Sequence, residues 1–149
     1  MRLLSATLVG VALSLFSARA VAEPASIEGQ WVTFDKETNQ KRSIVEIVLQ
    51  GRRATGRVIQ LFLKPGEDPD PVCADCPGTA RDRPIRGLYI LAVEAADSGT
   101  TYRGTVLDPE DGRVYSCVLT ILPDGKHLRV RGFVGLEIFG REETWVRSN

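Results

Sequence analysis

The chain has little of what the commonest catalytic and metal sites require. Among its 149 residues there are three cysteines and one histidine. Because serine-type nucleophilic catalysis uses a histidine as its base, the case for an enzyme of that class is weak. The chain also has no excess of positive or negative charge, because it has 19 basic and 19 acidic side chains. This balance excludes a nucleic-acid-binding protein. A hydrophobic content of 43% excludes a disordered chain.

Helical periodicity is absent beyond residue 22, apart from a weak pattern over residues 88–96. Short runs rich in Val, Ile, Leu and Thr recur instead, and turn residues such as Gly, Asp and Pro separate them. The sequence therefore predicts eight strands, at residues 27–34, 43–50, 54–63, 88–94, 101–107, 114–122, 127–134 and 142–147.

The first residues read as a secretory signal. Met1 and Arg2 precede an uncharged stretch over residues 3–16. At about 1.5 Å per helical residue this stretch covers roughly 21 Å, less than the roughly 30 Å hydrocarbon layer, so we expect no transmembrane anchor. The small residues at 20–22 predict cleavage after Ala22, with Ala20 as the second choice. We expect a cleaved signal peptide over residues 1–22 and a single periplasmic domain over residues 23–149.

Short connections between the runs require successive strands to be antiparallel. Alternation then predicts an inward face that includes Val45, Ile47, Ile59 and Leu61. With no helix to cover that face, the sheet has to close on itself or form a sandwich. Sequential hairpins favour an all-β, antiparallel, up-and-down eight-stranded barrel over the sandwich.

The even number of strands brings the start of the first and the end of the last to one end of the barrel. This places Trp31 near Trp145 and Arg147, where an arginine stacked on an indole can close the barrel. A tryptophan that merely fills the core is the alternative. By the same parity, the loops at residues 35–42, 64–87, 108–113 and 135–141 share the other end, which is the predicted mouth.

The connection over residues 64–87 is much longer than a hairpin loop and contains five prolines. Loops of this length tend to be lids, binding loops or flexible segments. The loop also contains Cys73 and Cys76, and in an exported protein a disulfide is the first expectation, either between these two or from one of them to Cys117. A redox or metal role is less favoured, because no helix follows the Cys-x-x-Cys pair and His127 is expected at the far end.

The predicted mouth supplies the candidate ligand contacts. Aromatic and charged side chains there could meet the polar end of a small molecule, and a few cations could meet an anionic group. These residues are Tyr89, Tyr115, Arg83, Asp108 and Arg141. The carboxylates around Asp108 lie in a Pro- and Gly-containing run that reads first as a hairpin turn. We expect no metal or cofactor.

Several motifs carry a family resemblance. Gly29-x-Trp31, together with Trp145-Val146-Arg147, resembles the Gly-x-Trp and C-terminal Arg arrangement of lipocalin-like (calycin) barrels. A longer ordered series is similar to the exported bacterial family called domain of unknown function 2147. The series is Gly29-x-Trp31, Ser43-Ile44-Val45-Glu46-Ile47, Cys73-x-x-Cys76-Pro77-Gly78, Arg83-Pro84-Ile85-x-Gly87-Leu88, Asp108-Pro109-x-x-Gly112-x-x-Tyr115-x-Cys117, Arg131-Gly132-Phe133-x-Gly135 and Gly140-Arg141-x-x-x-Trp145. The resemblance covers nearly the whole mature chain and implies a small periplasmic calycin-like barrel, without an established activity. Glu142 and Glu143 depart from the family's usual Thr or Gln after the late Gly-Arg pair.

Three functions follow from this fold. A hollow barrel would hold a small apolar or amphipathic ligand. A barrel filled by its own side chains would favour an interaction or envelope-maintenance protein that docks an envelope partner. A thiol enzyme or metal carrier would use Cys73, Cys76 and Cys117. The interior volume separates the first two, with about 300 Å³ as the low end for small-molecule pockets.

Overall fold

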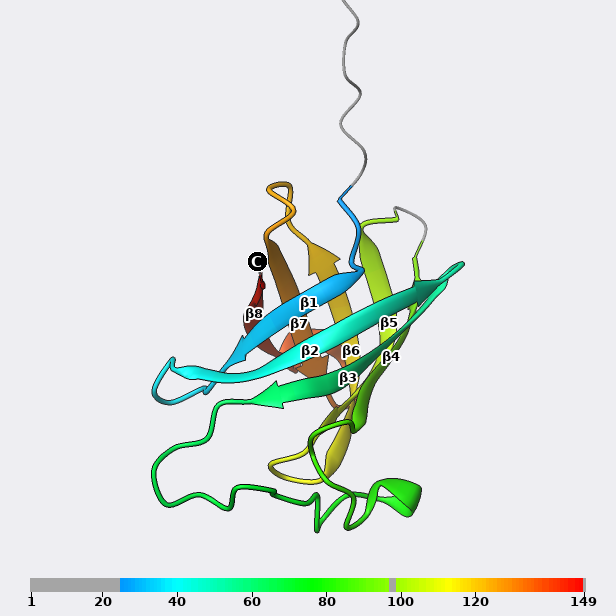
Figure 1. Cartoon of the computed structure of the whole chain (residues 1–149). Helices are drawn as coiled ribbons and strands as arrows, with labels where there is room; N and C mark the ends of the chain where they lie inside the picture. Colours follow the sequence, from blue (N-terminus) through cyan, green and yellow to red (C-terminus); the bar gives the residue numbers. More distant parts are fainter. Residues whose placement is uncertain (1–24, 97–98, 149) are drawn as a thin grey trace, which may run out of the picture.

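The computed structural model describes residues 25–96 and 99–148. The predicted signal peptide and both cleavage sites lie outside the described residues. Eight strands close into one barrel in sequence order, and every neighbouring pair is antiparallel (Figure 1). The expected up-and-down barrel is therefore confirmed.

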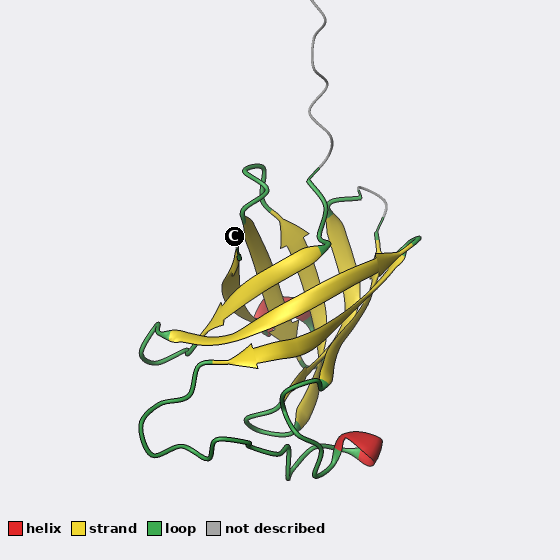
Figure 2. Ribbon diagram, in the orientation of Figure 1, coloured by secondary structure: helices red, strands yellow, loops and turns green. Residues whose placement is uncertain are grey.

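The strands follow the predicted runs closely. They are β1 (Gly29–Phe34), β2 (Lys41–Gln50), β3 (Arg53–Leu61), β4 (Tyr89–Ala95), β5 (Thr101–Asp108), β6 (Arg113–Ile121), β7 (His127–Phe133) and β8 (Arg141–Arg147). The weak helical pattern over residues 88–96 thus lies mostly in strand β4. Two single helical turns, η1 (Gly78–Ala80) and η2 (Glu137–Phe139), lie outside the sheet (Figure 2). Neither turn has the length or apolar character that crossing a bilayer requires, and the described part of the chain has no other helix.

The inward faces follow the predicted alternation except in β3. Val45 and Ile47 of β2 are buried as expected, but Ile59 is only half-buried and Val58 is fully buried in its place. A β-bulge explains this difference. Val45 pairs with Val58, whereas the preceding Ile44 pairs with Gln60, so Ile59 is the extra residue of the bulge. One inserted residue reverses the face on which the next side chain lies.

The closed end of the barrel is built around the Arg147 side chain. Its guanidinium lies 4.2 Å from the centroid of the Trp31 ring. Its Nε donates a hydrogen bond to the carbonyl of Gly125 at 2.8 Å, and its two terminal nitrogens donate to the carbonyls of Glu28 and Ser26 at 2.8 and 2.6 Å. One side chain therefore joins β8, the β6–β7 turn and the segment before β1.

The Gly-x-Trp pattern has a local physical cause at this end. Trp31 is fully buried and its indole N–H donates to the carbonyl of Ile27 at 2.8 Å. At Gly29, which has a φ of 128°, a Cβ atom would lie 2.6 Å from Nη1 of Arg147. Only glycine leaves room there for the guanidinium. Trp145 lies two residues before Arg147 on β8, is buried, and lines the cavity described below.

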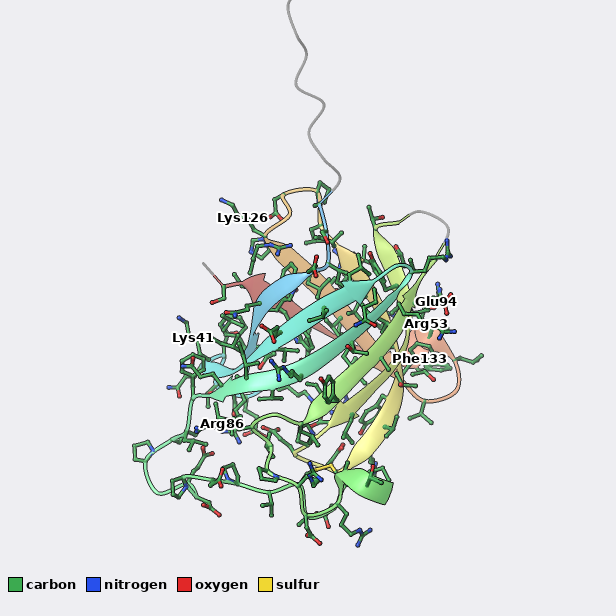
Figure 3. All side chains as sticks on the ribbon, turned by 45° about the vertical axis from the view of Figure 1, so that its right-hand side comes forward. Lys41, Arg53, Arg86, Glu94, Lys126 and Phe133 are labelled. Carbon is green, nitrogen blue, oxygen red and sulfur yellow. A yellow bond between two sulfur atoms is a disulfide. The ribbon has the colours of Figure 1, made fainter. Side chains whose placement is uncertain are left out.

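We predict that Arg147→Lys lowers the free energy of unfolding by about 2–3 kcal/mol, because a lysine ammonium cannot stack as a plane or reach all three carbonyls in a fork. Urea denaturation followed by tryptophan fluorescence measures the change. Arg53→Lys is the matched control, since Arg53 is exposed on β3 with one long contact of 3.7 Å to Glu94 (Figure 3). Equal losses in the two variants would contradict a closing role for Arg147.

Candidate functional site

A cavity of about 520 Å³ lies in the barrel at the end opposite the Arg147 stack. Its walls are mainly apolar, and the lining includes Val58, Ile90, Val106, Val130 and Trp145. This volume is within the range of about 300–1,000 Å³ that is typical of small-molecule pockets. The interior is therefore not filled by its own side chains.

Polar side chains also line the cavity, and of these Thr33 and Ser43 are buried whereas the charged ones are exposed or half-buried. The hydroxyls of Thr33 and Ser43, both buried, form a hydrogen bond of 2.7 Å. The indole Nε1 of Trp145 donates to a carboxylate oxygen of Glu143 at 3.3 Å. Apolar walls together with exposed or half-buried charged side chains suit a ligand that is mostly apolar and carries one polar end.

The Lys36 ammonium bridges two carboxylates at the cavity rim. It lies 2.9 Å from Asp108 at the end of β5 and 3.3 Å from Glu143 on β8. Burial by itself lowers the pKa of Lys36, but the hydrogen bonds and charges of the two carboxylates outweigh burial and raise that pKa above its usual value. Lys36 therefore stays charged and holds three strand ends together at the opening.

Tyr115 lies at the same rim, on β6. Its hydroxyl donates a short hydrogen bond to Asp111 in the β5–β6 turn. This hydrogen bond is the main cause that raises the pKa of Tyr115, so the phenol remains protonated at neutral pH. The same turn is closed by Asp108, whose carbonyl accepts from Gly112 N–H at 2.9 Å, as the hairpin-turn interpretation predicts.

The long loop over residues 64–87 lies across part of the opening, and we call it the lid (Figure 1). Its Pro71 and Ile85 line the cavity. Ion pairs join it to the rim. Lys64 contacts Asp35 at 2.8 Å, and Arg42 contacts both Glu67 of the lid and Glu110 of the β5–β6 turn at 2.9 Å. The hydrogen bond from Lys64 is the main cause that lowers the pKa of Asp35.

A disulfide between Cys73 and Cys76 forms the tip of the lid, and both residues are fully buried. This decides between the two expected pairings, because Cys117 is unpaired. Two backbone hydrogen bonds join Cys73 to the later part of the lid. The Cys73 N–H donates to the Arg83 carbonyl at 2.9 Å, and the Asp82 N–H donates to the Cys73 carbonyl at 2.9 Å.

The lid tip contacts the β5–β6 turn at Gly112. This residue has a φ of 69°, and a Cβ atom there would lie 2.2 Å from the carbonyl oxygen of Asp75. The contact thus requires glycine for both its backbone conformation and its lack of a side chain.

Cys117 lies in the middle of β6, between Gly104 of β5 and Gly132 of β7. Burial raises the pKa of its thiol to about 12, so the thiol is protonated at neutral pH and not poised for nucleophilic attack. His127 lies at the opposite end of the barrel from the lid, as expected, where its Nδ1 is 2.6 Å from Oδ2 of Asp124 in the β6–β7 turn. Within residues 25–96 and 99–148, no three His, Cys, Asp or Glu side chains are grouped closely enough for a metal ion.

The predicted ligand contacts separate into three groups. Asp108, Tyr115 and Arg141 line the cavity. Arg83 belongs to the lid, is exposed, and is not part of the cavity lining. Tyr89 lies on the outer wall with 63% of its surface exposed, next to Arg57, because Ile90 takes the inward position of β4.

Other lining residues were not predicted. Thr33 and Glu143 could have been found by counting two residues along each strand from Trp31 and Trp145, since alternate residues share a face. Lys36 has no such signal, because it lies in the β1–β2 loop, which follows no period. Arg42 lies in β2, but the register shifts beside it, where Thr33 pairs with Ser43 and Phe34 with Lys41, so simple alternation does not place it.

Three comparisons with known proteins bear on the family and the fold of the chain. The family model described as "Uncharacterized protein conserved in bacteria (DUF2147)" matches residues 29–147. No curated protein sequence matches the chain. Among solved structures, the chain is similar to protein HP1028 from Helicobacter pylori, described as belonging to the lipocalin family. The identity is 17%, the match covers 85% of each chain, and the TM-score is 0.69. That likeness shows a shared barrel fold.

Burial of the Cys117 thiol makes the free energy of unfolding depend on pH in the alkaline range. Its pKa is near 9.0 in the unfolded chain and about 12 in the folded one, so above pH 9 the unfolded chain loses a proton that the folded chain keeps. Stability therefore falls as pH rises. Between pH 8 and 10 we predict that the parent loses about 1 kcal/mol more than Cys117→Ala, measured by urea denaturation at each pH. Parallel pH profiles would contradict this.

Gly112→Ala is predicted to displace the lid tip, because the new Cβ cannot occupy the position of the Asp75 carbonyl. The disulfide should then be reduced faster by dithiothreitol, which mass spectrometry after alkylation measures. Gly51→Ala introduces an alanine at a similar φ of 62° with no atom within 4 Å, so it controls for backbone strain. If both variants are reduced at the parent's rate, the tip does not depend on this contact.

Proposed function

The chain belongs to the DUF2147 family of uncharacterized bacterial proteins, and from that premise we propose that its barrel binds a small apolar or amphipathic molecule of the cell envelope. The observation that carries the proposal is the cavity of about 520 Å³. Its volume exceeds the value of about 300 Å³ below which a docking protein with a solid core would be favoured.

The chemistry of the lining supports an amphipathic ligand. The apolar part of such a molecule would lie against Val58, Ile90 and Trp145, where contact with water is lost on binding. Its polar end would lie at the rim, where Arg113 and Arg141 are exposed. Because Lys36 already bridges two carboxylates, these two arginines are the cations better placed to meet an anionic group.

The fold supports the same conclusion by analogy. Eight-stranded barrels of the lipocalin type are wide enough for one small ligand. The chain shares this barrel fold with HP1028. The Cys73–Cys76 disulfide favours an oxidising compartment, which together with the signal-like N-terminal sequence supports export to the periplasm.

Filling the cavity tests the proposal. Gly132 lines it, and a Cβ there would meet only Tyr115 and Val106 at 3.7 and 4.0 Å, which is ordinary contact. Gly132→Leu therefore adds a side chain without backbone strain. We expect the binding of N-phenyl-1-naphthylamine, an apolar fluorescent probe, to weaken about tenfold or more. Native mass spectrometry of parent protein recovered from the periplasm should show a bound molecule.

Thr105→Leu is the matched control, because Thr105 is exposed on the outer face of β5 and the same side chain there leaves the cavity unchanged. Thermal denaturation of both variants checks that the barrel is intact. If Gly132→Leu binds the probe as tightly as the parent, or the parent binds none, the cavity does not serve as the binding site.

A further inference from the structure

The loop between β7 and β8 exposes an unusual amount of apolar surface. Its residues 134–139 include Val134, Leu136, Ile138 and Phe139, which are 77%, 64%, 73% and 75% exposed. We call these four side chains the apolar loop. Elsewhere in the described ranges, the exposed large hydrophobic side chains are Val48, Val72, Tyr89 and Val114, which are distributed over β2, the lid, β4 and β6. Contiguous exposed apolar surface of this kind marks an interaction site.

The loop is fixed to the barrel by its one acidic residue. The Glu137 carboxylate pairs with Arg103 of β5 at 2.8 Å, and its carbonyl accepts from Arg131 of β7 at 3.3 Å. The turn η2 is closed by the hydrogen bond from Gly140 N–H to the Glu137 carbonyl at 2.9 Å. Figure 3 shows Phe133, where the loop begins, on the flank of the barrel. These contacts hold the backbone so that the apolar side chains point to solvent instead of collapsing onto the wall.

We propose that the apolar loop inserts into the boundary between headgroups and acyl chains of an anionic lipid membrane. Four side chains are far fewer than the roughly 20–30 residues per partner of a stable protein interface, so the loop alone is too small to hold a second copy of the chain. A short apolar wedge flanked by cations is typical of segments that lie in the membrane interface.

Charge around the loop favours anionic lipid. Four arginines, Arg103, Arg129, Arg131 and Arg141, lie on the loop's neighbouring strands. Arg103 pairs with Glu137, and Arg129 and Arg131 both pair with Glu142, so the group has two more positive than negative charges. The neighbouring Glu143 is held by Lys36 at the rim. Long arginine side chains can keep their charge at the phosphates while the apolar side chains enter below them.

The loop is continuous with the cavity. Val134 and Phe139 belong to the cavity lining as well as to the exposed surface. Insertion would therefore bring the opening to the membrane surface. This step uses the geometry of the opening only, so membrane docking can hold even where the ligand test of the cavity fails.

A tryptophan reporter tests insertion directly. Both native tryptophans are buried, so Phe139→Trp places the one exposed indole on the loop, and Tyr89→Trp places one on the outer wall of β4. The probe is vesicles of phosphatidylglycerol and phosphatidylcholine whose acyl chains carry bromine, a quencher. We expect quenching and a blue shift for Phe139→Trp beyond the parent's signal, and none for Tyr89→Trp. Equal signals from the two reporters would overturn the proposal.

Removing apolar surface gives the second measurement. Leu136→Ser combined with Ile138→Ser should weaken vesicle partitioning by about tenfold or more in a sedimentation assay, whereas Val48→Ser combined with Val72→Ser should leave it unchanged. All variants keep the same N-terminus, so binding by that segment is common to all of them, and circular dichroism checks the fold. Equal partitioning of the two double variants overturns the proposal, as does a parent dimer in light scattering that the loop variant abolishes.

Discussion

Closure between β1 and β8 is the constraint on which this structure depends. The described chain has no helix that could cover an open sheet, so the first and last strands must pair. Their register joins only Trp31 with Arg147 and Val32 with Val146, which is the shortest pairing in the barrel. The seam is short in backbone hydrogen bonds, and the Arg147 side chain supplements it through three carbonyls and the Trp31 ring. The glycine at position 29 follows from the same requirement, because the guanidinium occupies the space of its absent side chain.

Sealing one end decides where a cavity can form. Alternate residues of β8 pass from the seal to the rim, in the order Arg147, Trp145, Glu143 and Arg141. The first packs on Trp31, the next two line the chamber, and the last lies exposed at the opening. One strand thus sets a gradient from a closed apolar end to a charged rim. An amphipathic molecule would match this gradient with its apolar part inward.

The period of two was sufficient to predict the barrel, its strands and the shared ends, because closure and strand parity follow from connection lengths. The predicted inward position of Ile59 was wrong, because strand alternation does not reveal where a β-bulge shifts the pairing. Tyr89 points outward because its neighbour Ile90 is buried. The composition of β4 alone does not show which of these two side chains lies inward. The sequence did not decide which cysteines form the disulfide, because three cysteines allow more than one pairing. The structure of the lid was required to identify the pair. Lys36 and the exposed apolar loop lie outside the strands, where periodicity carries no information.

The two sides of the opening differ in what would have to break for a ligand to enter. On the lid side, Lys64 and Arg42 make ion pairs with Asp35, Glu67 and Glu110, and the disulfide tip packs on Gly112. Entry there would separate several charged groups at once. On the β7–β8 side the rim includes Val134 and Phe139, apolar side chains already exposed to solvent, beside the exposed Arg141. Displacing these two apolar side chains would break no ion pair of their own, and the loop backbone is tied to β5 by the Arg103–Glu137 ion pair. For the ligand proposed above, entry on the β7–β8 side would therefore separate fewer charged groups than entry on the lid side.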